Sequence, residues 1–328
     1  MRIVIAGGSG HLGTILAREF HGEHEVVVLG RSRQLRPWRT EIWDGETIGP
    51  WAGSIDGADV VVNLAGRSVN CRYNETNREE IVRSRVASTR IIGEAITRSS
   101  HPPALWLQAS TATIYAHRYD APNDEEHGVI GGTEAGVPET WRFSIDVARQ
   151  WERAADEAPM PRTRLVKMRT AIVMSPERGG AFDLLLRLVR MGLGGRAGDG
   201  LQFVSWIHHR DFVRAIRFIM AKPFVDGPVN IAAPKPLPNA EFMRALREAW
   251  GVRAGLAANR RLLEIGSFFL RTETELILKS RRVVPARLLR YGFCFEHPGW
   301  EEAAQILCDE WRALHEGGTP TARGKARW

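Results

Sequence analysis

Short strand-like runs alternate with helical segments along the first half of the chain. The runs lie at residues 1–6, 26–29, 40–43, 59–66, 105–109 and 164–169, and the two longest helical segments lie at 74–98 and 140–157. A run of apolar residues without polar alternation is typical of a strand that is covered on both faces. The alternation from residue 2 to about 170 predicts an α/β fold, a Rossmann-type doubly wound parallel sheet whose ligands lie at the carboxyl ends of its strands.

The pattern changes after residue 175. Residues 176–204 are punctuated by glycines around a helical stretch and are expected to form a lid over the substrate. Residues 205–235 add a helix, for which Asp211 is the expected N-cap, and a strand that completes the first domain, 1–175. Residues 236–317 predict a smaller, mostly helical C-terminal substrate lobe, and the basic tail 318–328 is expected to be disordered.

A glycine cluster follows the first strand and opens the first helix. In Gly7-Gly8-Ser9-Gly10-His11-Leu12-Gly13, Gly7 permits a tight turn, Gly10 lets backbone N–H groups approach a pyrophosphate, and Gly13 lets the helix pack close to its strand. This context predicts a dinucleotide site, with a purely structural turn as the alternative. The expected contacts are Gly7, Ser9, Gly10, His11, Leu12 and Gly13.

The residues after the second strand predict which dinucleotide binds. An Asp or Glu there would bind the ribose 2′-OH of NAD, whereas Arg accommodates the 2′-phosphate of NADP. No acid follows this strand within reach, and Arg31, Ser32 and Arg33 supply two cations and a hydroxyl. NADP is therefore favoured over NAD, and a solvated basic loop is the alternative. At the same sheet edge, the dinucleotide is also expected to lie against Asn63, Leu64, Ala65 and Gly66.

Composition and charge narrow the class of protein. The 328 residues are 25% charged and 44% hydrophobic, with a net charge of +7 and a pI of about 9.7. No Lys/Arg block is interleaved with aromatic residues, so nucleic acid is not an expected partner. Three cysteines without paired spacing predict neither a disulfide framework nor a metal site, and they suit a reducing cytoplasm. No run approaches the ~18 apolar residues of a membrane span.

Several motifs, in order, resemble the extended short-chain dehydrogenase/reductase superfamily. They are the turn at 7–13, the strand end at 63–66 and the segment 205–211. Within that superfamily the chain resembles the NAD(P)-dependent epimerase/dehydratase-like family with a DUF1731 C-terminal domain, through further matches at Ser84-Arg85, 194–202, 227–234 and 282–295. The resemblance implies the fold, a nicotinamide cofactor and a DUF1731-like part from about residue 280, and it implies no particular substrate.

The resemblance also implies where the chemistry would occur. Relatives use a Ser or Thr near the end of the fifth strand and a Tyr-x-x-x-Lys on the following helix, where the Lys and the cofactor lower the pKa of the Tyr. Ser110 and Thr111 can supply the hydroxyl. The Tyr-x-x-x-Lys pair is missing, because Ser144 and Ala148 stand at the two expected positions.

Four other residues are candidates for site roles. Tyr115, expected at the rim of the site just past Thr111, is the first choice for the missing acid, and a packing tyrosine is the alternative. His208 and His209 have a suitable intrinsic pKa, although this stretch serves mainly structure in the superfamily. Arg85 stands where many extended members carry an Asn, so it is expected to bind an anionic substrate unless it is an exposed helix residue.

Two functions remain open at this point. The leading hypothesis is an NADP-binding oxidoreductase or epimerase that acts on an unidentified small molecule, with hydride moving to or from a carbon near Ser110 and Thr111. The alternative is a non-catalytic NADP(H)-binding sensor or scaffold. The missing Tyr and Lys favour the second, and the glycine-rich lid favours the first. A homodimer through the helices at 74–98 and 140–157 would be ordinary for the superfamily.

Overall fold

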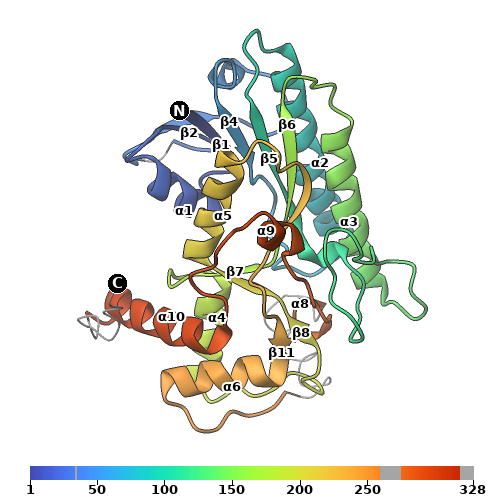
Figure 1. Ribbon diagram of the computed structural model, residues 1–328, viewed down its shortest axis with the longest axis vertical. Coiled ribbons are helices and arrows are strands. Elements are labelled where there is room, and N and C mark those ends of the chain that lie inside the picture. The colour runs from blue at the N-terminus through green and yellow to red at the C-terminus, as the bar shows by residue number, and fades with distance from the viewer. Residues whose placement is uncertain (34, 259–274, 318–328) are drawn as a thin grey trace.

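The computed structural model describes residues 1–33, 35–258 and 275–317, and its centre is a seven-stranded sheet (Figure 1). The strand order is β10-β6-β5-β4-β1-β2-β3, and every neighbouring pair is parallel. This order confirms the predicted Rossmann-type sheet. The strands are β1 (Arg2–Ala6), β2 (Glu25–Gly30), β3 (Arg39–Ile42), β4 (Val60–Asn63), β5 (Leu105–Thr111), β6 (Arg164–Thr170) and β10 (Gly227–Ile231).

Helices cover both faces of the sheet (Figure 1). On β1, Ile3 and Ile5 belong to one core with α1 (His11–Phe20) and α5 (His209–Ala221), while Val4 belongs to another core with α2 (Glu75–Arg98). Successive strand side chains point to opposite faces, so both sets must be apolar. This explains the unbroken apolar runs. The helix α3 (Glu139–Asp156) packs beside α2.

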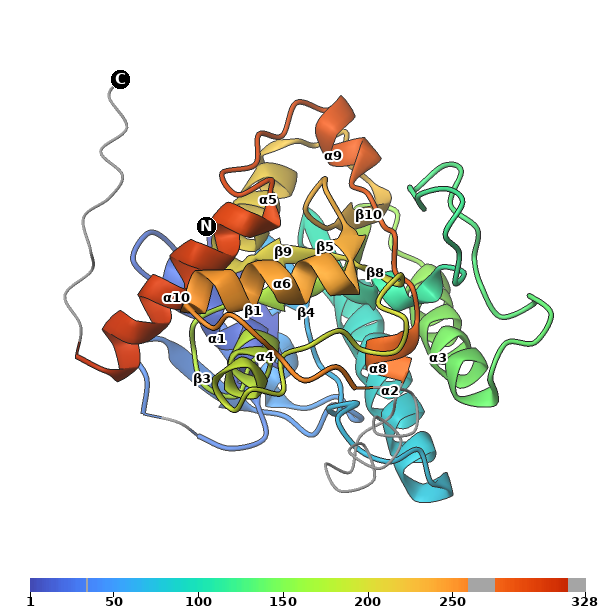
Figure 2. The same cartoon turned by 90° about the horizontal axis from the view of Figure 1, so that it is seen from below.

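A smaller lobe lies beyond the carboxyl ends of the strands (Figures 1 and 2). It contains α4 (Ala181–Arg190), α6 (Asn239–Trp250) and α10 (Trp300–His315). The last two helices confirm the predicted helical C-terminal lobe, whereas α4, which was expected in a lid, buries Phe182 and Leu186 in the core of this lobe. Its core is aromatic, because Phe242 of α6 stacks on Trp300 of α10 with ring centroids 4.0 Å apart and Trp206 meets Trp300 edge-on. Aromatic burial of this kind dominates the stability of a small core.

Several short elements complete the structure. The strands β7 (Ile172–Met174) and β9 (Trp206–His208) pair in parallel and link the sheet domain to the lobe. Their length of three residues gives no periodicity from which a strand could be predicted. The others are β8 (Phe203–Val204), β11 (Leu237–Pro238), α8 (Glu275–Leu278), α9 (Ala286–Arg290) and the 3-10 helices η1 (Pro50–Ser54) and η2 (Ala112–Ile114).

The observed start of α2 agrees with the start predicted from the sequence, and the observed start of α5 differs from its prediction. Asn74 caps α2, and its side chain accepts a hydrogen bond from the Asn77 amide at 2.9 Å. The prediction that Asp211 caps the next helix is wrong, because α5 begins earlier and His208 is its N-cap. The buried Asp211 carboxylate instead accepts from the Glu296 and His297 amides, tying the lobe to α5. The predicted disordered tail lies outside the described residues.

None of the helices in residues 1–33, 35–258 and 275–317 combines the length and apolar character that crossing a bilayer requires.

Candidate cofactor and substrate site

The turn between β1 and α1 has the close backbone contacts expected from its glycines. Gly7 has a φ of 73°, and a Cβ there would lie 2.8 Å from the backbone of Ala65. A Cβ on Gly13 would lie 2.4 Å from the Gly8 Cα. Neither position has room for a side chain, so the glycines bring the strand end, the turn and the helix into direct backbone contact.

A groove of about 620 Å³ runs over this turn, within the range of about 300–1,000 Å³ that is usual for small-molecule pockets. It lies at the carboxyl ends of the strands, where an open parallel sheet binds its ligands. Seven of the residues expected to contact the dinucleotide line it, namely Gly7, Ser9, Gly10, Arg31, Leu64, Ala65 and Gly66.

The other expected cofactor residues lie around the groove without lining it. His11 Nε2 lies 2.7 Å from Ser175 Oγ, and burial lowers the pKa of its imidazole. Asn63 is buried, donates to Gln108 Oε1 at 2.9 Å and accepts from the Ala65 amide at 3.0 Å, so it shapes the strand end. Leu12 packs against the core, Gly13 is buried in α1, and Ser32 and Arg33 are exposed beyond the groove.

Four of the six charged residues that line the groove form two ion pairs. Three acids missed by the sequence analysis line it, because the third strand and α2 bring Asp44, Glu46 and Glu80 to this edge. Glu46 pairs with Arg83 at 3.3 Å, and Glu80 pairs with Arg67. Within the described ranges no ion pair involves Asp44 or Arg31. The Asp44 carboxylate accepts hydrogen bonds from the Glu46 and Thr47 amides, and the Arg31 guanidinium is available for an anion.

A second, smaller cavity lies next to the groove. It measures about 110 Å³ and is bounded by Thr111 at the end of β5, Ser144 on α3, Arg85 on α2 and Tyr73. At about 30 Å³ for each water molecule, it would hold roughly four of them. A substrate would therefore place only a small part of itself, such as a carbonyl and its neighbours, in this space.

Arg85 lies between the groove and the small cavity. Its side chain packs 3.3 Å from the position of a Cβ on Gly66, and its guanidinium lies 5.0 Å from the centroid of the Trp151 ring. Burial lowers its pKa to about 10, while the neighbouring Tyr73 hydroxyl and Cys71 thiol oppose that shift. The guanidinium donates to the Ile81 carbonyl at 3.1 Å, and no carboxylate of the described chain pairs with it.

Comparison with known proteins places the chain in a family. The model of the NAD dependent epimerase/dehydratase family matches residues 3–232, and that of a domain of unknown function, DUF1731, matches residues 261–307. The chain belongs to the NAD dependent epimerase/dehydratase family. The resemblance seen in the sequence is thereby confirmed.

Members of the family with similar sequences include a human protein. The human epimerase family protein SDR39U1 is 32% identical over 302 residues, which are 91% of this chain and 96% of the human one. The crystal structure of human epimerase family protein SDR39U1 (isoform 2) with NADPH matches with a TM-score of 0.82 and 30% identity, over 94% and 99% of the two chains. A nucleoside-diphosphate sugar epimerase from Corynebacterium glutamicum matches with a TM-score of 0.71 and 28% identity, over 94% of this chain and 58% of that one.

Two predicted catalytic residues of this epimerase family member are held in a buried polar network. The Ser110 hydroxyl donates to Glu152 at 2.6 Å, and Arg169 donates to both Glu152 oxygens at 2.8 Å. The Tyr115 hydroxyl donates to Asn230 at 2.9 Å and accepts from Arg169 at 3.0 Å. The prediction that Tyr115 lies at the rim is wrong, because the residue is 2% exposed, and burial raises the pKa of its phenol.

The reason for that error lies in the local chain path. The 3-10 helix η2 follows β5 directly and turns Tyr115 inward, where it joins a small core with Ile114 and Val283. Thr111 is the one of the three predicted catalytic residues that lines the small cavity. Its hydroxyl accepts a hydrogen bond from the Thr113 amide at 3.1 Å, which orients it.

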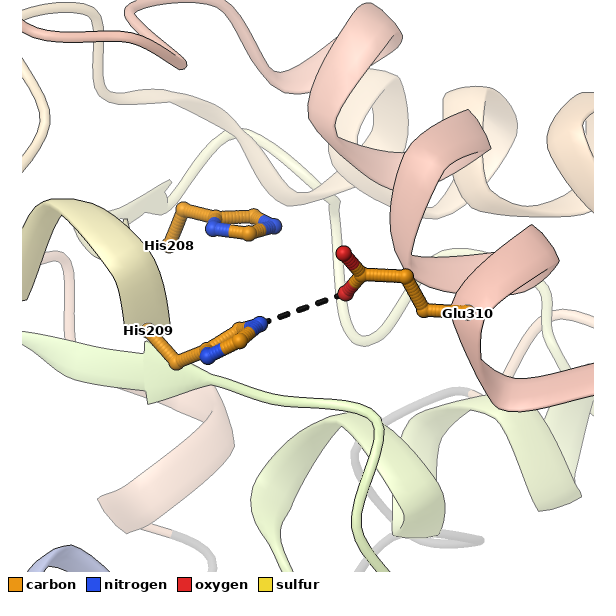
Figure 3. Close-up of side chains that lie close together, drawn as sticks. All are labelled: His208, His209 and Glu310. Carbon is orange, nitrogen blue, oxygen red and sulfur yellow. Dashed lines mark hydrogen bonds and ion pairs between the residues drawn. The ribbon is translucent and has the colours of Figure 1, made fainter. Parts of the chain in front are cut away.

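His208 and His209 lie at a second cluster, away from both cavities (Figure 3). Their rings lie side by side, 4.6 Å apart, and point toward Glu310 of α10. His209 Nε2 lies 3.2 Å from Glu310 Oε2, and Arg210 holds the other Glu310 oxygen. The three side chains are close enough to consider as ligands of a metal ion.

The hydrogen bonding of His208 argues against metal binding at this cluster. Its Nδ1 accepts from the Arg210 amide at 3.2 Å, so the neutral ring carries its hydrogen on Nε2 and offers no lone pair there. Burial and the nearby His209 and His297 rings hold the pKa of His208 far below its usual range. The geometry gives His208 a capping role and His209 a contact between α5 and α10.

Proposed function

We propose that the protein is an NADP(H)-dependent oxidoreductase or epimerase acting on a small molecule. The observation that carries the proposal is the groove over the Gly7–Gly13 turn, which Arg31 lines, together with the neighbouring cavity of Thr111 and Arg85. The NADPH in the human SDR39U1 structure supports the choice of cofactor. The three cysteines are free thiols, which supports a reducing, cytoplasmic location.

Some residues of the site would bind the cofactor or the substrate, and others would orient the substrate oxygen. A bound nicotinamide would supply or accept a hydride. The groove of Gly7, Gly10 and Ala65 would hold the diphosphate against backbone, and Arg31 would face the 2′-phosphate. The Thr111 hydroxyl would orient the substrate oxygen. Arg85 would bind negative charge on the substrate, since no carboxylate of the described residues neutralises it.

The cofactor assignment is tested by replacing Arg31 and Arg33 with Ala. Arg31 carries the interaction with a 2′-phosphate, so we expect the double variant to bind NADPH at least about tenfold more weakly, a loss of about 1.4 kcal/mol. NADH lacks that phosphate, and its affinity should change by less than about twofold. Fluorescence titration measures both affinities. Equal losses for the two dinucleotides would exclude a 2′-phosphate site at Arg31.

Only a measurement of turnover distinguishes an enzyme from a non-catalytic sensor. The absence of a Tyr-x-x-x-Lys pair favours a sensor, because Ser144 and Ala148 cannot exchange a proton at neutral pH. We expect loss of NADPH absorbance with at least one compound in a panel of small carbonyl compounds and sugar nucleotides. Tight NADPH binding without turnover across the whole panel would instead support a sensor or scaffold.

A further inference from the structure

Tyr73 occupies the place that the missing tyrosine leaves open. It precedes the Asn74 cap of α2, lines the small cavity with Thr111 and Arg85, and packs edge-on against Phe143 of α3. The hydroxyl of Ser144, which stands at the expected tyrosine position, lies 3.4 Å from the Tyr73 hydroxyl. The phenol thus reaches the cavity from the segment just before α2 rather than from α3.

The lysine position has a similar replacement. Ala148 is fully buried and carries no charge, but Arg85 brings a guanidinium to the same cavity and lies over Trp151, three residues further along α3. The electrostatic interaction between Arg85 and the Tyr73 hydroxyl favours the charged form of both groups. A phenol and a guanidinium group are therefore present together beside Thr111.

Other charged groups face Tyr73 as well. Arg281 is buried and its charge also interacts with the Tyr73 hydroxyl. Glu275 of α8 lines the cavity and accepts the hydrogen bond of the Ser144 hydroxyl. Cys71, on the same segment as Tyr73, interacts with Arg85. Among the described residues, the guanidinium groups of Arg85 and Arg281 thus oppose the carboxylate of Glu275 around this phenol.

We propose that Tyr73 is the proton donor and acceptor of this site and that Arg85, besides binding the substrate, takes the part of the missing lysine. The inference rests on the proposed function and specifies its chemistry. Tyr115 lacks this position, since it does not line the cavity and its hydroxyl is engaged by Asn230 and Arg169.

The proposed step is the reduction of a carbonyl group. A hydride from NADPH forms the new C–H bond at the carbonyl carbon, which is reduced to an alcohol as NADPH is oxidised to NADP⁺. The carbonyl oxygen takes the proton of the Tyr73 hydroxyl, while the Thr111 hydroxyl orients that oxygen. Arg85 stabilises the phenolate until it takes a proton from solvent, and oxidation of an alcohol follows the same path in reverse.

The first test compares Tyr73→Phe with two other tyrosine variants. We expect Tyr73→Phe to lower kcat at least about 100-fold, the usual range for loss of a positioned acid, with NADPH affinity within about threefold of the wild type. Tyr119→Phe is the matched control, because Tyr119 is 43% exposed. Tyr115→Phe should retain turnover. A Tyr73→Phe protein that keeps more than half of the wild-type kcat would overturn the proposal.

The second test needs neither substrate nor cofactor. The chain has four tyrosines, so the near-ultraviolet phenolate absorbance of the wild type minus that of Tyr73→Phe isolates the titration of Tyr73. The same subtraction in an Arg85→Met background should move that titration to higher pH, because the nearby cation is gone. An unchanged curve would overturn the role of Arg85. Circular dichroism of each variant verifies its fold.

The two tests separate this inference from the proposed function. If the wild type binds no NADPH, or turns over no compound of the panel, the proposed function fails whatever the phenol titration shows. If the wild type turns over a substrate and Tyr73→Phe does so equally well, only the assignment of Tyr73 fails. Loss of turnover in Tyr115→Phe alone would return the role to Tyr115.

Discussion

Glu152 and Arg169 form a buried ion pair at the centre of the sheet domain. The two side chains are 9% and 10% exposed, and Ser110 donates a further hydrogen bond to the carboxylate. Removing one partner of such a pair leaves an uncompensated buried charge, which typically costs 3–5 kcal/mol. We therefore expect Glu152→Gln to lower the free energy of unfolding by about 3 kcal/mol, measured by urea denaturation at pH 7.

The same pair predicts how stability changes with pH. Burial alone would raise the pKa of Glu152, but the hydrogen bonds and charge of Arg169 outweigh burial and lower it. A depressed carboxyl pKa contributes stability above the unfolded value of about 4.3, and this contribution is lost as the pH falls through the folded value. The difference between wild type and Glu152→Gln should thus shrink below about pH 4. Glu94→Gln, at an exposed pair with Arg98, is the control and should cost under about 0.5 kcal/mol.

The sequence predicted which types of side chain the site contains, but it did not predict which of them line the cavity. Ser110 and Thr111 are adjacent hydroxyl residues at the end of one strand, and nothing local distinguishes them. The structure separates them, since Glu152 binds the first while the second lines the cavity. Tyr73 carried no signal in the sequence, because its relation to Ser144 depends on the packing of α2 against α3.

At the scale of elements, the start of α1 depends on the contact between Gly13 and the preceding turn. An added methyl at Gly13 would meet the Gly8 backbone, which cannot move like a flexible side chain. We expect Gly13→Ala to displace the helix from the turn and to weaken NADPH binding at least about tenfold, or about 1.4 kcal/mol, as measured by fluorescence titration.

Gly22→Ala is the matched control for this helix. Gly22 follows the C-cap of α1, His21, and a Cβ there would meet nothing within 4 Å. The substitution should leave NADPH affinity unchanged. If Gly13→Ala bound NADPH as well as Gly22→Ala does, close packing of helix and turn would not be what forms the site.

The elements themselves were largely predictable. The predicted strands and long helices agree with β1, β2, β3, β4, β5, β6, β10, α2 and α3 to within a few residues, because their apolar pattern repeats over several turns or pleats. The pairs β7–β9 and β8–β11 were missed since each strand has only two or three residues.

At the scale of the whole molecule, the expected homodimer through α2 and α3 remains a prediction. A shallow groove along these helices is lined by Val82, Val86 and Phe143, with Arg90 and Glu94 among its charged residues. Charges of both signs suit a two-fold interface, where each patch meets its own copy. We expect Val86→Glu to convert the dimer to a monomer in light scattering, whereas Leu314→Glu on α10 should not. A monomeric wild type would contradict the dimer.

The sequence by itself determined the sheet, the order of its elements and the turn that faces the cofactor. These features depend on the periodicity of neighbouring residues and on glycines at positions with no room for a side chain. Only the tertiary structure decided which side chains meet. Tyr73, Arg85, Thr111 and Ser144 come from three separate parts of the chain, and the packing of α2 and α3 against the end of β5 brings them to one cavity. That packing depends on how closely the side chains along the whole buried faces of the helices and strands fit together. No short stretch of sequence contains this information.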